Sequence, residues 1–247
     1  MNNEKKEIAW NPWHGCTKIS EGCRNCYVYR QDEMYGSAIS SNICRKTADF
    51  NLPIKKKRNG DYKIESKQVI PTCFTSDFFL NDADLWRDDC WKMIKQRQDC
   101  YFYFFTKRID RFYQCIPDDW QDGYENVAIG CTVENQQAAD YRLPIFLQAP
   151  IKYRLIIAAP ILEQIDLTKY LSSKIQEVSV GGESGGKARI CYYDWILNIR
   201  SQCIKQNIAF TFHQTGANFV KDGKHYNIRR CYQKQQARKA NIDFQPK

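Results

Sequence analysis

The stretch Trp10-Asn11-Pro12-Trp13-His14-Gly15-Cys16, continued through Cys23 and Cys26 to Tyr27, decides how the rest of the chain is interpreted. Its three cysteines have the spacing C-x6-C-x2-C. Pro12, Gly15 and Gly22 interrupt helix or strand, so we expect a loop wrapped around a ligand. Structural zinc sites are usually closed by four ligands. Three thiolates without a fourth favour a 4Fe–4S cluster whose remaining iron is free to bind a substrate or cofactor.

This stretch resembles the cluster loop of radical S-adenosylmethionine enzymes, although the x6 spacing departs from the C-x3-C-x2-C most familiar there. The wider run W-N-P-W-x-G-C-T-K-x-S-x-G-C-x-N-C-Y is more similar to a phage and mobile-element family. That family carries a three-cysteine motif and is described as radical-SAM-like, with no assigned function. Further blocks match it in the same order, at residues 75–79, 106–108, 130–135 and 180–185. One block departs, because Ala159-Pro160 stands where the family has Glu-Pro, so any role of that glutamate is missing or moved here.

The resemblance implies both cofactors and site residues. Cys16, Cys23 and Cys26 would ligate three irons, and the fourth iron would bind S-adenosylmethionine. An electron from an external donor would then cleave that cofactor to a 5′-deoxyadenosyl radical. The expected cofactor-binding residues are Ser76, Asp77, Lys107, Glu134, Asn135, Gly181, Gly182 and Glu183. Arg108, next to Lys107, could bind the methionine carboxylate or a substrate phosphate, or could lie on the surface. The candidate catalytic residues are Asp77, Glu183 and His213, and a packing or capping role for His213 stays equally open.

His14 leaves a second interpretation of the cysteine stretch. Together with the three cysteines it would complete a Cys3His zinc set. Zinc ribbons and knuckles usually bring two short chelating pairs, whereas this stretch has only the pair Cys23 and Cys26. The alternative function is therefore a zinc-stabilised, non-enzymatic module that binds nucleic acid.

Composition favours an intracellular globular protein. At 247 residues and 43% hydrophobic content, the chain can build one large domain with a substantial core. Twelve cysteines would suit a secreted disulfide protein, but the polar residues 1–7 are not followed by the apolar region of a signal peptide. No run approaches the roughly 18 apolar residues of a membrane span. We expect a cytoplasmic, reduced protein whose other cysteines pack as small hydrophobic groups.

The formal charge of +9 is concentrated in two segments. Residues 51–67 contain Lys55, Lys56, Lys57 and Arg58, and Asn59-Gly60 predicts a hairpin turn there. Residues 221–247 carry eight basic residues, Arg229 and Arg230 among them, against two acidic ones. Such clusters suit a polyanionic partner. We therefore expect a DNA, RNA or nucleotide substrate, modified or repaired at a base or sugar. The alternatives are a solvated surface with a peptide or small-metabolite substrate.

Short apolar, β-rich runs recur along the chain and predict the fold. They begin near Val69, Tyr101, Asn126, Tyr153, Gln176 and Ile208, and their nearly continuous apolar character is typical of parallel strands buried on both faces. Helical spacing falls between them, at residues 86–97, 134–141 and 192–203. Counting a first strand at about residues 7–10, we predict an α/β fold, a partial (β/α) barrel of about six to seven units. It would span residues 1–220, with residues 51–67 as an insertion and residues 221–247 as a basic extension.

Every matching block falls just after a predicted strand. Functional groups of a β/α barrel lie on the loops at the C-terminal ends of its strands, so these blocks are expected to converge. For each block taken alone, a polar helix cap is the simpler explanation, because Asp, Ser, Thr and Asn are common there.

Overall fold

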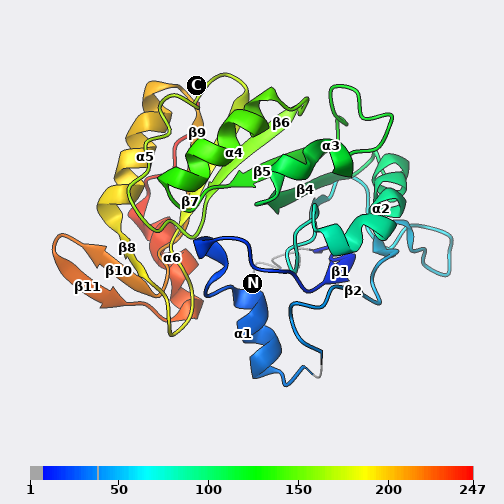
Figure 1. The fold of residues 1–247 in the computed structure, drawn as a ribbon, viewed down its shortest axis with the longest axis horizontal. Helices are drawn as coiled ribbons and strands as arrows, with labels where there is room; N and C mark the ends of the chain where they lie inside the picture. The colour runs from blue at the N-terminus through cyan, green and yellow to red at the C-terminus, as the bar shows by residue number, and fades with distance from the viewer. Residues whose placement is uncertain (1–7, 38, 247) are drawn as a thin grey trace. The chain divides into compact units, whose positions relative to one another are not determined.

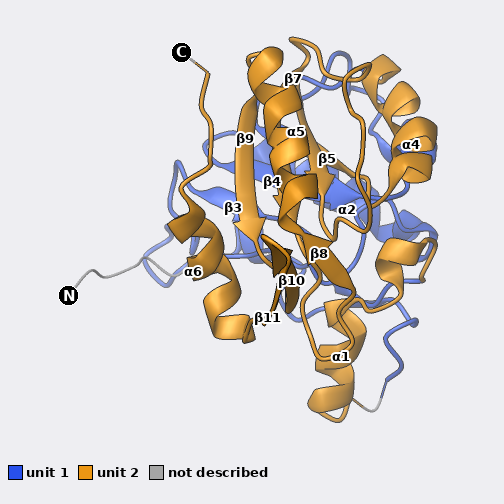
Figure 2. Ribbon diagram, turned by 90° about the vertical axis from the view of Figure 1, so that its left-hand side faces the viewer, with its two compact units in different colours: residues 1–17, 38–129, 150–152 blue, residues 18–37, 130–149, 153–247 orange. Residues whose placement is uncertain are grey.

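The structure is a computed structural model that describes residues 8–37 and 39–246. The chain divides into two compact units (Figure 2). Unit 1 comprises Met1–Thr17, Ala38–Ile129 and Pro150–Lys152, and unit 2 comprises Lys18–Ser37, Gly130–Ala149 and Tyr153–Lys247. The boundary between Thr17 and Lys18 falls inside the cysteine stretch, which places Cys16 in unit 1 and Cys23 and Cys26 in unit 2.

The main sheet has six strands in sequential order, β3-β4-β5-β6-β7-β9 (Figure 1). The strands are β3 (Val69–Pro71), β4 (Tyr101–Thr106), β5 (Val127–Thr132), β6 (Tyr153–Ala158), β7 (Ile175–Gly181) and β9 (Ala209–Gln214). The pairs β3–β4, β6–β7 and β7–β9 are parallel. The predicted α/β fold with sequential strands is thus confirmed, and the sheet is open because β3 and β9 end the order.

The predicted first strand is a single bridge instead. Trp10 pairs with Thr72 in a parallel bridge, with Trp10 N–H donating to Pro71 O and Cys73 N–H donating to Trp10 O, both at 2.8 Å. Glu7 lies outside the described residues. Pro12 lacks the backbone N–H that would extend the ladder, so one bridge is formed and, within residues 8–37 and 39–246, the sheet holds six strands rather than seven.

Unit 1 is built on an aromatic core that includes the cysteine stretch. The ring of Phe78 stacks on Trp13 and Phe104, with centroids 5.3 and 4.5 Å apart, and meets Trp91 edge-on. Trp13 belongs to β1 (Trp13–His14), which pairs antiparallel with β2 (Arg45–Lys46), so the stretch predicted as a loop contains a short strand. The remaining elements are η2 (Leu52–Ile54), η3 (Asn81–Ala83), α2 (Asp84–Gln96), η4 (Ile109–Arg111) and α3 (Phe112–Cys115).

The basic segment of residues 51–67 forms a turn rather than a hairpin of two paired strands. Lys57 N–H donates to Asp61 O at 2.7 Å, and Lys63 N–H donates to Lys55 O at 2.8 Å. A single antiparallel bridge joins Lys56 and Tyr62. Gly60 has a φ of +90°, which suits the predicted Asn-Gly turn.

Unit 2 contains the helices that follow the later strands, together with a small second sheet of order β11-β10-β8. Its elements are η1 (Glu21–Cys23), α1 (Tyr27–Met34), α4 (Gln136–Gln148), β8 (Ile190–Tyr192), α5 (Tyr193–Lys205), β10 (Asn218–Lys221), β11 (Lys224–Asn227) and α6 (Arg230–Ala240). Helices at the three predicted positions are confirmed by α2, α4 and α5. Among the described residues, no helix is long and apolar enough to cross a membrane.

Candidate cysteine site

Cys16 lies in unit 1 just after β1, beside the side chain of Arg108. Arg108 Nη1 is 3.6 Å from Cys16 Sγ, while Nη2 donates to Thr17 O at 2.7 Å and to Thr17 Oγ1 at 2.9 Å. Burial alone would lower the pKa of Arg108, but Asp77 and Cys16 outweigh it and raise that pKa, so the guanidinium stays charged. A fixed cation beside the sulfur is the environment in which a thiolate, the form that binds metals, is stable.

Asp77 fixes Arg108 in this position. Its buried carboxylate accepts four hydrogen bonds of 2.8 to 3.1 Å, from the backbone N–H groups of Phe79 and Lys107, from Thr106 Oγ1 and from Arg108 Nη1. The neighbouring Ser76 donates its hydroxyl to Gly15 O at 2.5 Å. In unit 1, therefore, two of the residues expected to bind the cofactor, Ser76 and Asp77, hold the backbone and the cation next to Cys16.

The loop with Cys23 and Cys26 is held in unit 2 by a buried ion pair. Gly22 N–H donates to Glu134 Oε1 at 3.4 Å, and Glu134 Oε2 accepts from Arg142 Nη1 at 2.7 Å. The side chains of Glu134 and Arg142 are only 1% and 7% exposed. A Cβ at position 22 would lie 2.9 Å from Glu134 Cδ, so glycine allows the loop to approach this closely.

Glu183, directly after β7, holds the same loop through a second set of contacts in unit 2. Asn25 Nδ2 donates to Glu183 Oε2 at 2.9 Å, and the guanidinium of Arg189 binds both carboxylate oxygens at 2.6 and 3.1 Å. Arg189 also donates to Glu21 O at 2.9 Å. Burial alone would raise the pKa of Glu183, but the hydrogen bonds from Arg189 and Asn25 outweigh it and hold that pKa below its usual value.

Other predicted residues have local structural contacts. Asn135 is the N-cap of α4, and its side chain accepts from Ala138 N–H at 2.8 Å. Gly182 lies against the segment after β9, where an added Cβ would be 2.3 Å from Thr215 O. His213 is exposed on β9. The polar helix cap considered in the sequence analysis as the simpler explanation is therefore what the structure shows for Asn135.

The cysteines differ in burial. Cys16, Cys23, Cys26 and Cys44 are half-buried, seven others are buried and Cys231 is exposed. Burial raises the pKa of Cys44 to about 11. Burial raises the pKa of Cys191 and Cys203 to about 12, which keeps them as inert thiols. Within the described ranges, no group of three or more His, Cys, Asp or Glu side chains is gathered closely enough to hold a metal ion. The thiols of Cys16, Cys23 and Cys26 fit a cluster by their donor chemistry.

The partners of the buried acids were missed by reasoning from the sequence. Arg142 lies two helical turns after Glu134, and Arg189 lies six residues after Glu183, so both were close enough in sequence to be considered. These two arginines could have been predicted as partners, because a glutamate that follows a buried strand and is itself buried needs a nearby cation. The contact between Asn25 and Glu183 could not be predicted in this way, because 158 residues separate them.

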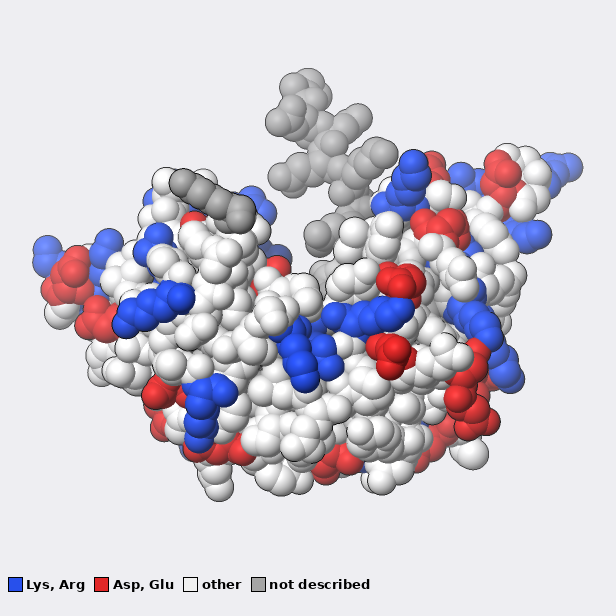
Figure 3. Space-filling view, turned by 90° about the horizontal axis from the view of Figure 1, so that it is seen from above, with Lys and Arg blue, Asp and Glu red and all other residues white. Residues whose placement is uncertain are grey.

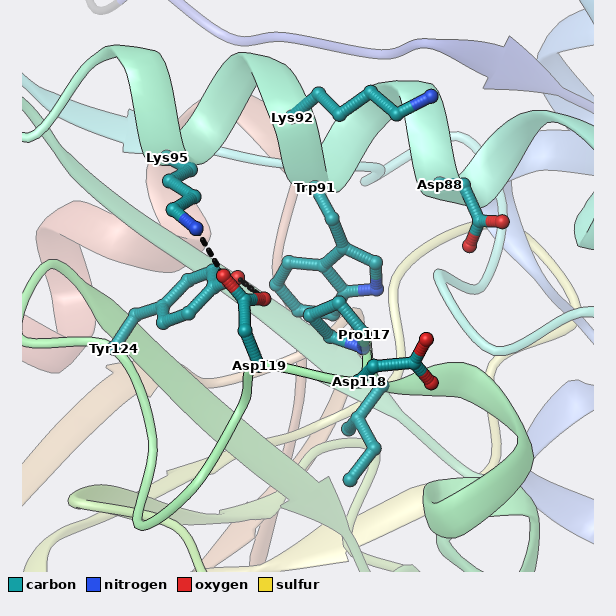
Figure 4. Close-up of a pocket in the computed structure, with 9 residues that line it drawn as sticks. Asp88, Trp91, Lys92, Lys95, Pro117, Asp118, Asp119 and Tyr124 are labelled. Atoms are coloured by element: carbon teal, nitrogen blue, oxygen red, sulfur yellow. Dashed lines mark hydrogen bonds and ion pairs between the residues drawn. The ribbon is translucent and has the colours of Figure 1, made fainter.

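A separate hollow of about 330 Å³ lies in unit 1 between α2 and the segment after α3 (Figure 4). Two of its charged groups are paired, because Asp119 accepts from Lys95 and from the Tyr124 hydroxyl. Trp91 also lines it. None of the predicted site residues lines it.

Comparison with known proteins gives a family match and three structural likenesses. A family model described as "Protein of unknown function (DUF5131)" matches residues 3–243. A spore photoproduct lyase complexed with dinucleoside spore photoproduct is 14% identical, with a TM-score of 0.45 over 94% of this chain and 70% of that one. A mutant of spore photoproduct lyase is 12% identical, with a TM-score of 0.44 over 94% and 71%. No curated protein matches the chain.

Proposed function

The chain belongs to the family described as "Protein of unknown function (DUF5131)", and we propose that it is a radical S-adenosylmethionine enzyme with a 4Fe–4S cluster. The observation that carries the proposal is the set of three half-buried cysteines at C-x6-C-x2-C, in a chain that buries most of its other thiols. The resemblance of this stretch to the cluster loop of radical S-adenosylmethionine enzymes supports it further.

In this proposal Cys16, Cys23 and Cys26 hold the cluster, which when bound supplies the electron that cleaves S-adenosylmethionine. The protein's own contribution is to orient these ligands. Arg108 places a positive charge beside Cys16 Sγ, and Asp77 fixes that cation. In unit 2, buried acid–base pairs built on two glutamates fix the backbone from Glu21 to Asn25, which flanks Cys23.

Spectroscopy of protein purified without oxygen tests this function. We expect a brown protein with a broad absorption band, a Mössbauer signature of a 4Fe–4S cluster, and iron and acid-labile sulfide in equal amounts. Incubation with a reductant and S-adenosylmethionine should release 5′-deoxyadenosine. A colourless protein with one stoichiometric zinc and no iron would contradict the proposal and would support the Cys3His site that includes His14.

We also propose that the substrate is a nucleic acid or nucleotide, supported by the two basic segments. Lys55, Lys56, Lys57 and Arg58 are all exposed. Binding of nucleic acid weakens as salt rises, because condensed counterions are released. Reversing these four charges should lower both the affinity and its salt dependence while leaving the iron content unchanged. Filter binding to DNA and RNA across a salt series measures this. Binding that charge reversal does not alter would exclude these four residues as the contact surface, and absence of measurable binding at low salt would favour a peptide or metabolite substrate.

A further inference from the structure

Helix α6 carries basic residues and no acidic ones. Its sequence from Arg230 to Ala240 contains four cations, and Arg230, Lys234 and Arg238 recur at every fourth position. Residues four apart lie on one side of an α-helix. These three exposed side chains form what we call the basic stripe, which extends over about 12 Å because each residue adds about 1.5 Å.

The stripe runs alongside the side of α6 that packs on unit 2, and its three side chains are exposed. Gln233 and Ala237 are buried. Gln233 is anchored at both ends, because its backbone carbonyl accepts from Thr215 N–H at 3.3 Å and its side-chain amide donates to Ile228 O at 2.9 Å. These contacts fix the rotation of α6 about its axis and so the position of the stripe, whose three side chains are exposed.

The stripe costs the helix stability. Like charges four residues apart destabilise a helix by about 0.2–0.5 kcal/mol per pair, and cations near its N-terminus oppose the helix dipole. Arg229 is the N-cap and Arg230 the first residue, so both cations stand at that unfavourable end. In the part of the chain that the structure describes, none of the stripe residues forms an ion pair with an acidic side chain.

Three lysines elsewhere on the surface differ in this respect. Lys95, Lys152 and Lys169 each contact an aspartate or glutamate, at 3.1 Å for Lys169 and Asp140. On the face drawn in Figure 3, blue side chains are likewise interspersed with red ones. An external anion would relieve the repulsion within α6.

We propose that the basic stripe of α6 binds the phosphodiester backbone of a nucleic acid. A regularly repeating polyanion matches charges that repeat every ~6 Å along a helix. A membrane surface fits less well, because an interfacial helix needs an apolar face of residues such as Trp, Phe or Leu. In α6 the exposed large hydrophobic residue is Tyr232, an amphipathic side chain. The inference deepens the proposed nucleic-acid substrate by naming the surface that contacts it.

The edge strand β11 extends the same surface. All four of its residues are exposed, and it leads through Ile228 and Arg229 directly into α6. Lys224 pairs in register with Lys221 of β10, which places two further cations side by side on the hairpin. Lys221, Lys224 and the basic residues of α6 therefore lie within one stretch of about twenty residues.

The test compares two triple variants with equal net charge. R230Q/K234Q/R238Q and the control K95Q/K152Q/K169Q each lower the formal charge from +9 by three, to +6. Fluorescence anisotropy measures binding to single-stranded DNA, duplex DNA and RNA of one length between about 50 and 200 mM salt. Losing three phosphate contacts should reduce the slope of log K against log salt by about 2.7 for duplex and about 2.1 for single strands. At about 0.1 M salt, the affinity of the stripe variant should then fall about 10²-fold.

The control variant should keep most of the wild-type slope. R230K/K234R/R238K, which keeps the charges, should bind as the wild type does, and this shows whether a loss comes from charge or from a damaged helix. Equal losses in the two charge-lowering variants would overturn the proposal, and so would stripe-dependent binding to phosphatidylserine vesicles without binding to nucleic acid. Iron content is read separately. Stripe-dependent binding by a protein without iron would refute the radical enzyme and leave this proposal standing.

Discussion

Replacing Glu134 by glutamine tests whether the acids after the strands hold the cysteine loop. Glutamine keeps the size of the side chain and an oxygen that Gly22 N–H can use as an acceptor. It removes the negative charge that faces Arg142, whose Nη1 lies 2.7 Å from Glu134 Oε2. The guanidinium would then stay buried with Thr132 O as its remaining acceptor, also at 2.7 Å.

The expected cost follows from the burial of this pair. Both side chains are less than a tenth exposed, so solvent can neither screen the pair nor replace the lost partner. Breaking one member of a buried ion pair costs about 3–5 kcal/mol, because it leaves an uncompensated buried charge. For a protein of this length, 1 kcal/mol corresponds to roughly 2–4 °C, so we expect a Tm lowered by about 6–20 °C.

Thermal and urea unfolding of the metal-free protein, followed by far-UV circular dichroism, measure this change. D89N is the matched control: Asp89 and Lys92 form a pair 54% and 77% exposed, which should cost less than about 1 kcal/mol. The double variant E134L/R142M should recover most of the loss, since apolar residues of similar volume can replace a buried pair. A loss below about 1 kcal/mol in E134Q, or a double variant no better than the single one, would refute the reasoning.

Single replacement of Cys16, Cys23 or Cys26 by alanine should abolish iron binding. Iron content measured after anaerobic reconstitution should stay near wild type for the control replacements Cys44, Cys73, Cys90, Cys115 and Cys231; two essential residues among these would indicate a second cluster. Arg97 hydrogen bonds lower the pKa of Asp99 from 3.8 to about 2. This stabilisation should be complete above about pH 4 and lost as pH falls toward 2, so the difference in urea midpoint between wild type and D99N should shrink over that range, and a constant difference would contradict it. Gly182→Ala should lower the free energy of unfolding, measured in urea, by about 1–3 kcal/mol, because the added methyl group would clash with Thr215 O. An unchanged urea midpoint would show that the backbone around Thr215 moves to accommodate the methyl group at no cost.

Strand positions could be predicted from the sequence because burial on both faces leaves a local signal. The run from Val127 to Thr132 is almost wholly buried, and its apolar letters are consecutive. The bridge at Trp10 carried a similar signal but is interrupted by Pro12. Apolar patterning gives strong information about which segments enter the sheet and weak information about how many residues each contributes.

The contacts of the site residues could not be predicted in the same way. Ser76, Asp77, Glu134 and Glu183 were singled out by their position after strands, and the structure does place each of them beside part of the cysteine stretch. Which group each one binds depends on side chains brought near by the tertiary fold. Their predicted contacts with S-adenosylmethionine stay predictions.

The chain after α6 returns to the end strand of the main sheet. Phe210 and Phe244 exchange backbone hydrogen bonds of 2.9 Å, and Asp243 Oδ1 accepts from Phe212 N–H at 2.8 Å. An uncovered edge strand offers unpaired backbone groups to other molecules and promotes aggregation. Residues 243 and 244 therefore shield β9 from intermolecular pairing. Deleting the C-terminal stretch to remove its basic residues would also expose this edge, and precipitation would then be mistaken for lost affinity.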